Sequence, residues 1–149
     1  MRRFGVVLAL GLVALTSGLA LAGHEKSGGK SAGPALGGYC PVAYVAMNQA
    51  VKGDLKFAMK HKGRRYLFVN ADAMKMFKKT PEKFAVSYDS WCATAMAMGQ
   101  RVASDPTQFT VRAGVTYLFS NAEARQMFDG DAEAMVVKAD AAWKQLGGK

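Results

Sequence analysis

The pattern of apolar and polar positions divides the chain into three parts. An apolar run near the start is followed by a Gly-, Ser- and Lys-rich stretch, residues 23–38, that carries few apolar side chains. From Tyr39 to about Leu146 apolar positions recur at regular spacing. The patterned part alone has enough apolar residues to form a core, and its length suits one compact domain.

Within the patterned part, the spacing of apolar residues predicts the same order of elements twice. Phe57 and Met59 alternate with polar residues, as do Tyr66 and Phe68, which is typical of strands with one buried face. An asparagine precedes each of two later helical patterns and is a favoured N-cap. The first unit is expected to contain a helix at 41–48, strands at 56–62 and 64–69, and a helix after Asn70. The second is expected to contain a helix at 93–100, strands at 109–112 and 115–119, a helix after Asn121, and a last helix at 132–146.

Direct self-comparison shows that the two units are a tandem repeat. Residues 66–77 match residues 117–128 at an offset of 51, and Tyr39-Cys40 falls on Trp91-Cys92 at an offset of 52. Further pairs are Gly63 with Gly114, Phe57 with Phe109, and Trp91 with Trp143. Repeats of this kind predict one supersecondary unit used twice. The expected fold is therefore α+β, with two pseudo-symmetric units of helix, β-hairpin and helix (about 39–90 and 91–146) packed as one compact domain over 39–149.

The N-terminus has the features of a secretory signal peptide at residues 1–22. Arg2 and Arg3 precede the apolar run, and Ala20-Leu21-Ala22 supplies the small residues that signal peptidase recognises. The run is short for a membrane anchor and is interrupted by polar and glycine residues. We therefore expect an exported protein, periplasmic or secreted, with no membrane span after cleavage and with residues 23–38 as a flexible lead-in.

The basic charge changes this picture little. The formal net charge is +9, and loss of Arg2 and Arg3 leaves 18 basic against 11 acidic residues, or +7. The basic residues are scattered, apart from a dense run at 60–65. In an exported protein this charge indicates a solvated face and loose attraction to anionic envelope surfaces, and no nucleic-acid partner is expected.

Several motifs together resemble the exported YHS-domain family. The opening Gly-Tyr-Cys-Pro-Val-Ala-Tyr at 38–44 is similar to the family's Gly-Tyr-Asp-Pro-Val-Ala-Tyr. Further along, the residue types follow the order typical of the family at Phe57, Gly63, 66–68, Phe77 and 81–84. The second half of the family pattern is similar to 91–93, Asp105-Pro106 and 114–118. The resemblance covers essentially the whole patterned region.

This resemblance implies a link to metal handling, with a metal transporter or another envelope protein as partner. Metal-binding relatives of the family place cysteines after the Tyr-x-Phe strand and in the next helix. The corresponding stretch here, residues 69–73, contains no sulfur ligand, and Cys40 stands where exported members carry Asp. A metal site in this chain would therefore be a different one.

The two cysteines, Cys40 and Cys92, occupy equivalent places at the start of a helix in each unit. A pseudo-two-fold packing of the units would bring them together, and three interpretations stay open. A disulfide between them would stabilise the fold by about 4 kcal/mol in the chain-entropy model. Alternatively, the two thiolates bind copper(I) or another soft metal ion, with Met96 as a thioether ligand. Free structural or redox-sensing thiols are the third interpretation.

The chemistry expected of the chain is binding rather than catalysis. No nucleophile turn, phosphate-binding glycine loop or Cys-x-x-Cys pair is present in the sequence, and His61 is expected to pack or to lie at an edge. We therefore expect an exported YHS-like domain that binds a soft metal ion through its cysteine pair. The alternative is a disulfide-stapled, non-catalytic interaction or small-ligand module whose surface is formed by Tyr39, Tyr44, Tyr88 and Trp91.

Overall fold

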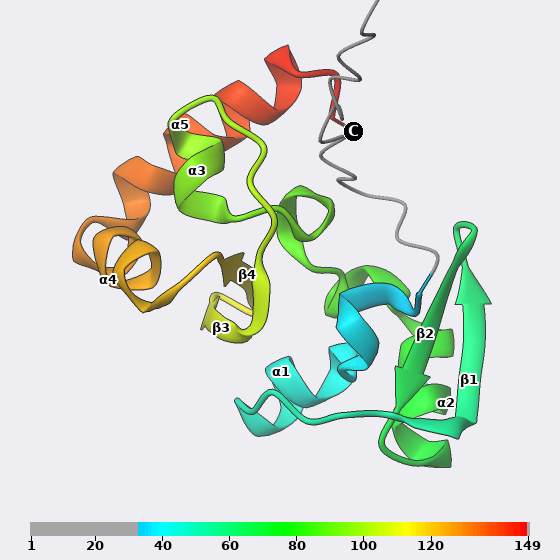
Figure 1. Cartoon of the computed structure of the whole chain (residues 1–149). Helices are drawn as coiled ribbons and strands as arrows, with labels where there is room; N and C mark the ends of the chain where they lie inside the picture. The colour runs from blue at the N-terminus through cyan, green and yellow to red at the C-terminus, as the bar shows by residue number, and fades with distance from the viewer. Residues whose placement is uncertain (1–32, 149) are drawn as a thin grey trace, which may run out of the picture.

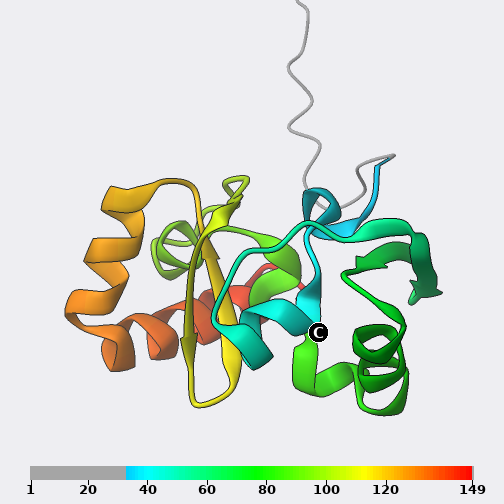
Figure 2. The same cartoon turned by 90° about the horizontal axis from the view of Figure 1, so that it is seen from below.

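The computed structural model describes residues 33–148, which form two units side by side in one compact α+β domain (Figures 1 and 2). The predicted signal peptide and residues 23–32 of the predicted lead-in lie outside the described residues. None of the helices in the described part is long and apolar enough to cross a bilayer.

Both units contain the predicted order of elements. The first unit consists of η1 (Ala35–Gly38), α1 (Pro41–Met47), β1 (Asp54–His61), β2 (Arg64–Phe68), α2 (Ala71–Lys79) and η2 (Pro81–Phe84). The second consists of η3 (Ser87–Ser90), α3 (Ala93–Ala97), β3 (Asp105–Arg112), β4 (Val115–Phe119), α4 (Ala122–Gly130) and α5 (Ala132–Gln145). Each strand pair is a separate two-stranded antiparallel sheet.

Short-range chemistry accounts for the hairpins and for the helices that follow them. Lys62-Gly63 and Ala113-Gly114 connect the strands, and all four residues have positive φ. Two such residues in succession form the type I′ turn that matches the twist of a hairpin. The side chains of Asn70 and Asn121 each accept a 2.8 Å hydrogen bond from the backbone N–H three residues later. The predicted N-caps are therefore confirmed.

The structure corrects part of the repeat register. Asp54 pairs with Phe68 and Asp105 with Phe119, so the offset is 51 throughout the hairpins. Phe109 therefore corresponds to Ala58, and its predicted equivalence with Phe57 is wrong. The one-residue slip lies at the end of the first helix, which is longer in the first unit.

The second correction of the register concerns Trp143. This residue lies in α5, whereas Trp91 precedes α3, so the two tryptophans are not structural equivalents. Trp143 lies 52 residues after Trp91, but only the first turn of α5 has a counterpart in the first unit, the short helix η2, which begins 51 residues earlier.

The folded part begins earlier than the predicted boundary at Tyr39. Ala35 and Leu36 in η1 are buried, so the last residues of the predicted lead-in belong to the domain. η1 has the same conformation as η3, with Leu36 and Tyr88 at equivalent buried positions and with positive φ. Each unit therefore begins with this short turn, and the second starts near Ser87 rather than at Trp91.

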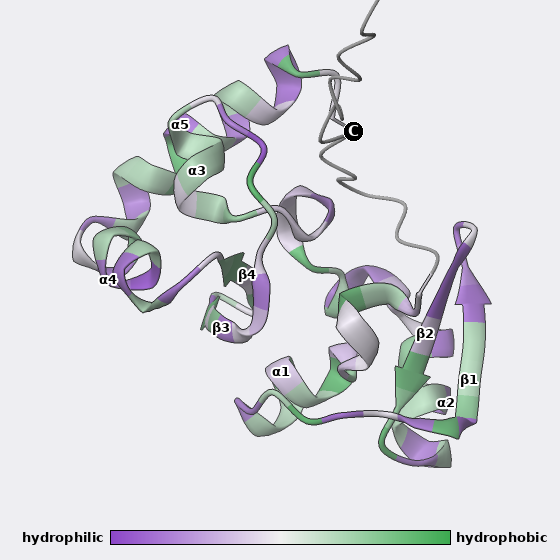
Figure 3. Ribbon diagram, in the orientation of Figure 1, coloured by the Kyte–Doolittle hydropathy of each residue, from purple (hydrophilic) through white to green (hydrophobic). Residues whose placement is uncertain are grey.

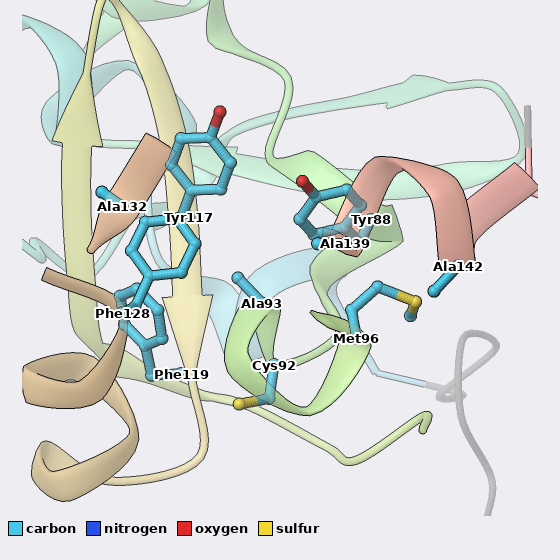
Figure 4. Close-up of a cluster of buried hydrophobic side chains, with 10 residues drawn as sticks. All are labelled: Tyr88, Cys92, Ala93, Met96, Tyr117, Phe119, Phe128, Ala132, Ala139 and Ala142. Atoms are coloured by element: carbon cyan, nitrogen blue, oxygen red, sulfur yellow. The ribbon is translucent and has the colours of Figure 1, made fainter. Parts of the chain in front are cut away.

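Buried apolar side chains form one core within each unit and a cluster between them. Figure 3 shows that the turn end of the β1–β2 hairpin is hydrophilic and that apolar residues occur in the helices and strands of both units. The first core contains Cys40, Val42, Ala43, Phe68, Ala73, Phe77 and Phe84. The second core, drawn in Figure 4, contains Tyr88, Cys92, Ala93, Met96, Tyr117, Phe119, Phe128, Ala132, Ala139 and Ala142. The central cluster contains Ala35, Leu36, Tyr44 and Leu118.

The units pack head to tail, which differs from the two-fold arrangement that the repeat suggested. Tyr44 of α1 packs edge-on against Phe109, with ring centroids 4.9 Å apart, and its hydroxyl donates a 2.8 Å hydrogen bond to the carbonyl of Pro106. A two-fold axis would place Met96, the equivalent of Tyr44, against Leu55, the equivalent of Pro106. Leu55 is instead 69% exposed, and Met96 belongs to a core that includes residues of α5. α5 therefore covers the side of the second unit that contains Met96. The equivalent side of the first unit, which contains Tyr44, is covered by the β3–β4 hairpin.

Two buried threonines provide a matched test of the packing in the second unit. Thr116 is fully buried and its hydroxyl has no hydrogen-bond partner among the described residues. The hydroxyl of Thr94, also buried, donates a 2.6 Å hydrogen bond to the carbonyl of Ala124. Because an unpaired buried hydroxyl is costly, we expect Thr116→Val to raise the free energy of unfolding by about 1 kcal/mol. Thr94→Val should lower it by about 1 kcal/mol. Urea denaturation of both variants measures the two signs, and a loss of stability in Thr116→Val would contradict the arrangement.

Candidate ligand-binding cleft

The structure does not bring the two predicted cysteine ligands together. Cys40 and Cys92 are both buried free thiols, and they belong to the separate cores of the two units. Each is held by its own unit, because the backbone N–H of Cys40 donates to Val51 and that of Cys92 donates to Val102, at 2.8 and 2.9 Å. Without a two-fold axis, equivalent positions in sequence do not become neighbours. Both cysteines precede a helix as predicted, but neither side chain caps it.

Met96, the predicted thioether ligand, is fully buried in the second core. In Figure 4 the sulfur atoms of Met96 and Cys92 point away from one another. The described residues contain no group of three or more His, Cys, Asp and Glu side chains that could hold a metal ion. Soft-metal binding through Cys40, Cys92 and Met96 stays a prediction, and the arrangement of these side chains does not favour it.

A cleft of about 560 Å³ lies between the two units. Segments that are distant in the sequence line it, among them the end of the β1–β2 hairpin, the connection from η2 to η3, Arg101, and the C-terminal end of α5 with the glycines after it. α5 packs against the rest of the second unit. This packing brings its C-terminal end into the lining of the cleft, together with the end of the β1–β2 hairpin. Tertiary packing alone therefore creates this site.

Aromatic side chains line both sides of the cleft. On the side of the first unit, Tyr66 packs on Phe77 at 5.1 Å between centroids, and His61 stands edge-on to Phe77 at 5.5 Å. On the other side, Tyr88 packs edge-on to Trp143 at 6.1 Å. His61, which was expected to pack or to lie at an edge, packs against Phe77. These rings form the aromatic part of the cleft lining, to which Phe77 and Tyr88, 2% and 6% exposed, contribute little surface.

The predicted aromatic surface is not formed as a single patch. Tyr44 is fully buried between the units, and Tyr39 is half-buried with the ammonium group of Lys52 4.2 Å from its ring. Trp91 is half-buried against the second core. Of the four predicted residues, only Tyr88 lines the cleft.

Both arginines of the cleft are held by partners. The guanidinium of Arg64, in the first unit, donates to the carboxylate of Asp89, in the second, at 2.6 Å. Arg101 donates to the carbonyl of Leu146 at 2.7 Å, and its guanidinium lies 5.6 Å from the ring centre of Trp143. The first contact joins the two units across the cleft, and the second attaches the end of α5 to the loop before β3.

The backbone of the cleft wall is strained at three successive residues. Tyr88, Asp89 and Ser90 have φ values of 53°, 50° and 70°, and none of them is glycine. At the equivalent places the first unit has Leu36, Gly37 and Gly38. A non-glycine residue in this region costs of the order of 1 kcal/mol or more. The turn is held by a 3.0 Å bond from the N–H of Trp91 to the carbonyl of Tyr88, and by a 2.7 Å bond from Ser104 to the carbonyl of Ser90.

The tyrosines of the cleft keep their protons. Burial raises the pKa of Tyr88 far above its ordinary value, and the hydrogen bond that its hydroxyl donates to Asp140 at 2.9 Å raises it further. Burial also raises the pKa of Tyr66, against the opposing effect of Arg64. Both hydroxyls are therefore neutral at physiological pH, and the proton of Tyr88 is used in its bond to Asp140.

Comparison of the chain with protein-family models, curated protein sequences and solved structures found no match. The resemblance to exported YHS domains stays a prediction that rests on the motifs quoted above. The fold and the cleft define the class of protein only as a two-unit α+β domain with an aromatic-lined hollow between the units.

Sequence reasoning missed most residues of the cleft. Arg101 and Gly148 belong to no local pattern, and the helical pattern that contains Trp143 does not mark it as a site residue. Asp89 and Ser90 carried a usable signal, because the repeat aligns them with Gly37 and Gly38. A polar residue at a position where the other unit has glycine points to a role for its side chain.

Proposed function

We propose that this protein is a non-catalytic binding module that holds a small organic ligand with a planar apolar body in the cleft between its two units. The observation that carries this proposal is the cleft of about 560 Å³ with aromatic rings on both sides. Its volume lies in the range of small-molecule sites, and such sites combine apolar walls with a few polar groups.

Binding is favoured over catalysis by the state of the polar side chains. His61, the cleft histidine, packs edge-on against Phe77. Arg64 is engaged by Asp89, and the hydroxyl of Tyr88 by Asp140. General acid–base chemistry needs a group free to exchange a proton with substrate. These contacts instead orient donors and rings, which is the requirement for recognition.

Binding is tested with the neutral probe N-phenyl-1-naphthylamine, whose fluorescence rises in apolar surroundings. We expect saturable binding of one probe per chain to the folded protein. Trp143→Ala removes one aromatic ring of the lining and is expected to weaken binding about fivefold, since aromatic contacts of this kind contribute about 1 kcal/mol. Fluorescence titration below the unfolding transition measures the dissociation constants.

Trp91→Ala is the matched control, because Trp91 is also half-buried in the second unit but does not line the cleft. Its dissociation constant should equal that of the parent protein. Equal weakening in both tryptophan variants would mean that the probe reports a general loss of packing. No saturable binding to the parent protein would reject the proposed function.

A further inference from the structure

We propose that the cleft recognises an organic anion, whose acidic group binds the guanidinium of Arg64, and that Asp89 takes the place of that group in the ligand-free protein. This inference rests on the proposed function and adds the chemical class of its ligand. The ligand would be a carboxylate, sulfonate or phosphate attached to an apolar or aromatic body. Asp89 is then a specificity-determining residue that acts as an internal competitor.

The first argument is the position of Asp89 on strained backbone. The equivalent residue of the first unit is Gly37, which adopts the same left-handed conformation without a side chain. The turn therefore does not need a carboxylate for its shape, and glycine would avoid the steric cost. Asp89 uses its side chain for a contact across the cleft, 2.6 Å from Arg64 of the other unit. Strain kept at a ligand-sized cleft indicates a functional role for that side chain.

The second argument is the exposure of the pair. The side chain of Arg64 is 26% exposed and that of Asp89 is 48% exposed. Ion pairs with this much solvent access contribute little net stability, so another anion can replace the carboxylate at small cost. Arg64 presents a planar fork of donors, of which Nη1 is the one that contacts Asp89. A ligand carboxylate or sulfonate can use the fork in two parallel bonds.

The third argument is the charge around the cleft. Lys62, Arg64 and Arg101 line it, against the carboxylates of Glu82 and Asp89. Arg101 is oriented by the ring of Trp143 and the carbonyl of Leu146, so its charge is fixed beside an aromatic wall. An anion that displaces Asp89 from Arg64 meets three cationic groups and two carboxylates, those of Glu82 and of the displaced Asp89, so the cleft keeps a net positive charge. This arrangement attracts an anion that carries an aromatic body.

The test compares two probes that share the same rings. 1-Anilinonaphthalene-8-sulfonate carries a sulfonate, and N-phenyl-1-naphthylamine is the same aromatic body without the charge. Asp89→Asn removes the internal competitor and keeps a side chain that tolerates positive φ. We expect it to tighten binding of the sulfonate about fivefold relative to binding of the neutral probe. Arg64→Gln should weaken the sulfonate about fivefold or more, again relative to the neutral probe.

Asp72→Asn and Arg65→Gln are the matched controls for these two variants. Each makes the same change of net charge at an exposed residue outside the cleft, so neither should alter the binding of either probe. If the controls shift sulfonate binding as much as the cleft variants do, the effect is general electrostatics and the inference is overturned.

The outcomes separate this inference from the proposed function. One outcome is that Trp143→Ala weakens binding of the neutral probe as expected, while Asp89→Asn and Arg64→Gln leave the dissociation constant of the sulfonate unchanged. In that case the anion subsite is rejected and the proposed function stands. If neither probe binds the cleft, both fail together.

Discussion

Replacing Tyr44 with alanine is expected to lower the free energy of unfolding by about 3–5 kcal/mol, as for other large aromatic side chains removed from a core. The side chain of Tyr44 is 0% exposed and lies where the two units meet. The substitution removes the contact with Phe109 and leaves the carbonyl of Pro106 without its donor. Chemical denaturation followed by far-UV circular dichroism measures the loss.

The same variant tests whether Tyr44 couples the two units. Both tryptophans lie in the second unit, so their fluorescence follows that unit, whereas circular dichroism follows the whole domain. The two transitions should coincide in the parent protein and separate in Tyr44→Ala, because coincidence of probes is the mark of cooperative unfolding. Tyr44→Phe, which loses only the hydroxyl, should cost about 1 kcal/mol.

Met47→Ala is the control on the same helix. Met47 is 53% exposed, and surface substitutions of this kind change stability by about 0.5 kcal/mol or less. A loss below about 1 kcal/mol in Tyr44→Ala would contradict the head-to-tail packing.

Both thiols are expected to resist labelling in the folded protein by a factor of about a thousand or more. Cys40 is 0% exposed and Cys92 is 1% exposed, so a thiol reagent reaches them only when the chain opens. A domain with a stability of about 5 kcal/mol is open only about once in several thousand. The measurement is the rate of reaction with Ellman's reagent, with and without denaturant, alongside the mass of the chain purified without reductant.

Ala46→Cys is the control for thiol labelling, because Ala46 is exposed on α1. In this variant one added thiol should react at once while the two native thiols stay protected. The expected mass is that of the fully reduced chain. A mass two units lower would establish a bridge between Cys40 and Cys92, and a copper-sized increment lost in either cysteine-to-serine variant would restore the metal hypothesis. Either result would contradict the separate burial of the two thiols.

The sequence predicted the local elements well because local chemistry determines them. The glycine at each hairpin turn and the asparagine before each second helix act over a few residues, and the structure confirms both. Phe57 and Met59 lie on β1 and pack against the first core, but Ala58 between them is half-buried as well, so the predicted alternation is not visible there. The tandem repeat was also visible without a structure. The residue-by-residue alignment of the repeat was wrong near the point where its offset changes from 52 to 51, as the mistaken pairing of Phe57 with Phe109 shows.

The candidate site was predicted only in part. His61 was expected to pack, and Tyr88 was expected at a ligand surface, and both lie in the cleft. Cys40 and Cys92 were predicted to lie together, as a disulfide or a metal site, because they occupy equivalent positions in the repeat. Equivalence in sequence becomes contact in space only if a symmetry axis passes between the units, and head-to-tail packing places each thiol in its own core.

The two units and their elements were therefore predictable from the chain alone, because turns, caps and apolar periodicity depend on neighbouring residues. The packing of the units and the position of the cleft depend on contacts between residues far apart in the chain. Arg64 meets Asp89 from 25 residues away, and Tyr88 meets Asp140 from 52 residues away. Such contacts depend on the packing of whole elements, in particular of α5 against the second unit, and a short stretch of sequence carries no periodic signal for them.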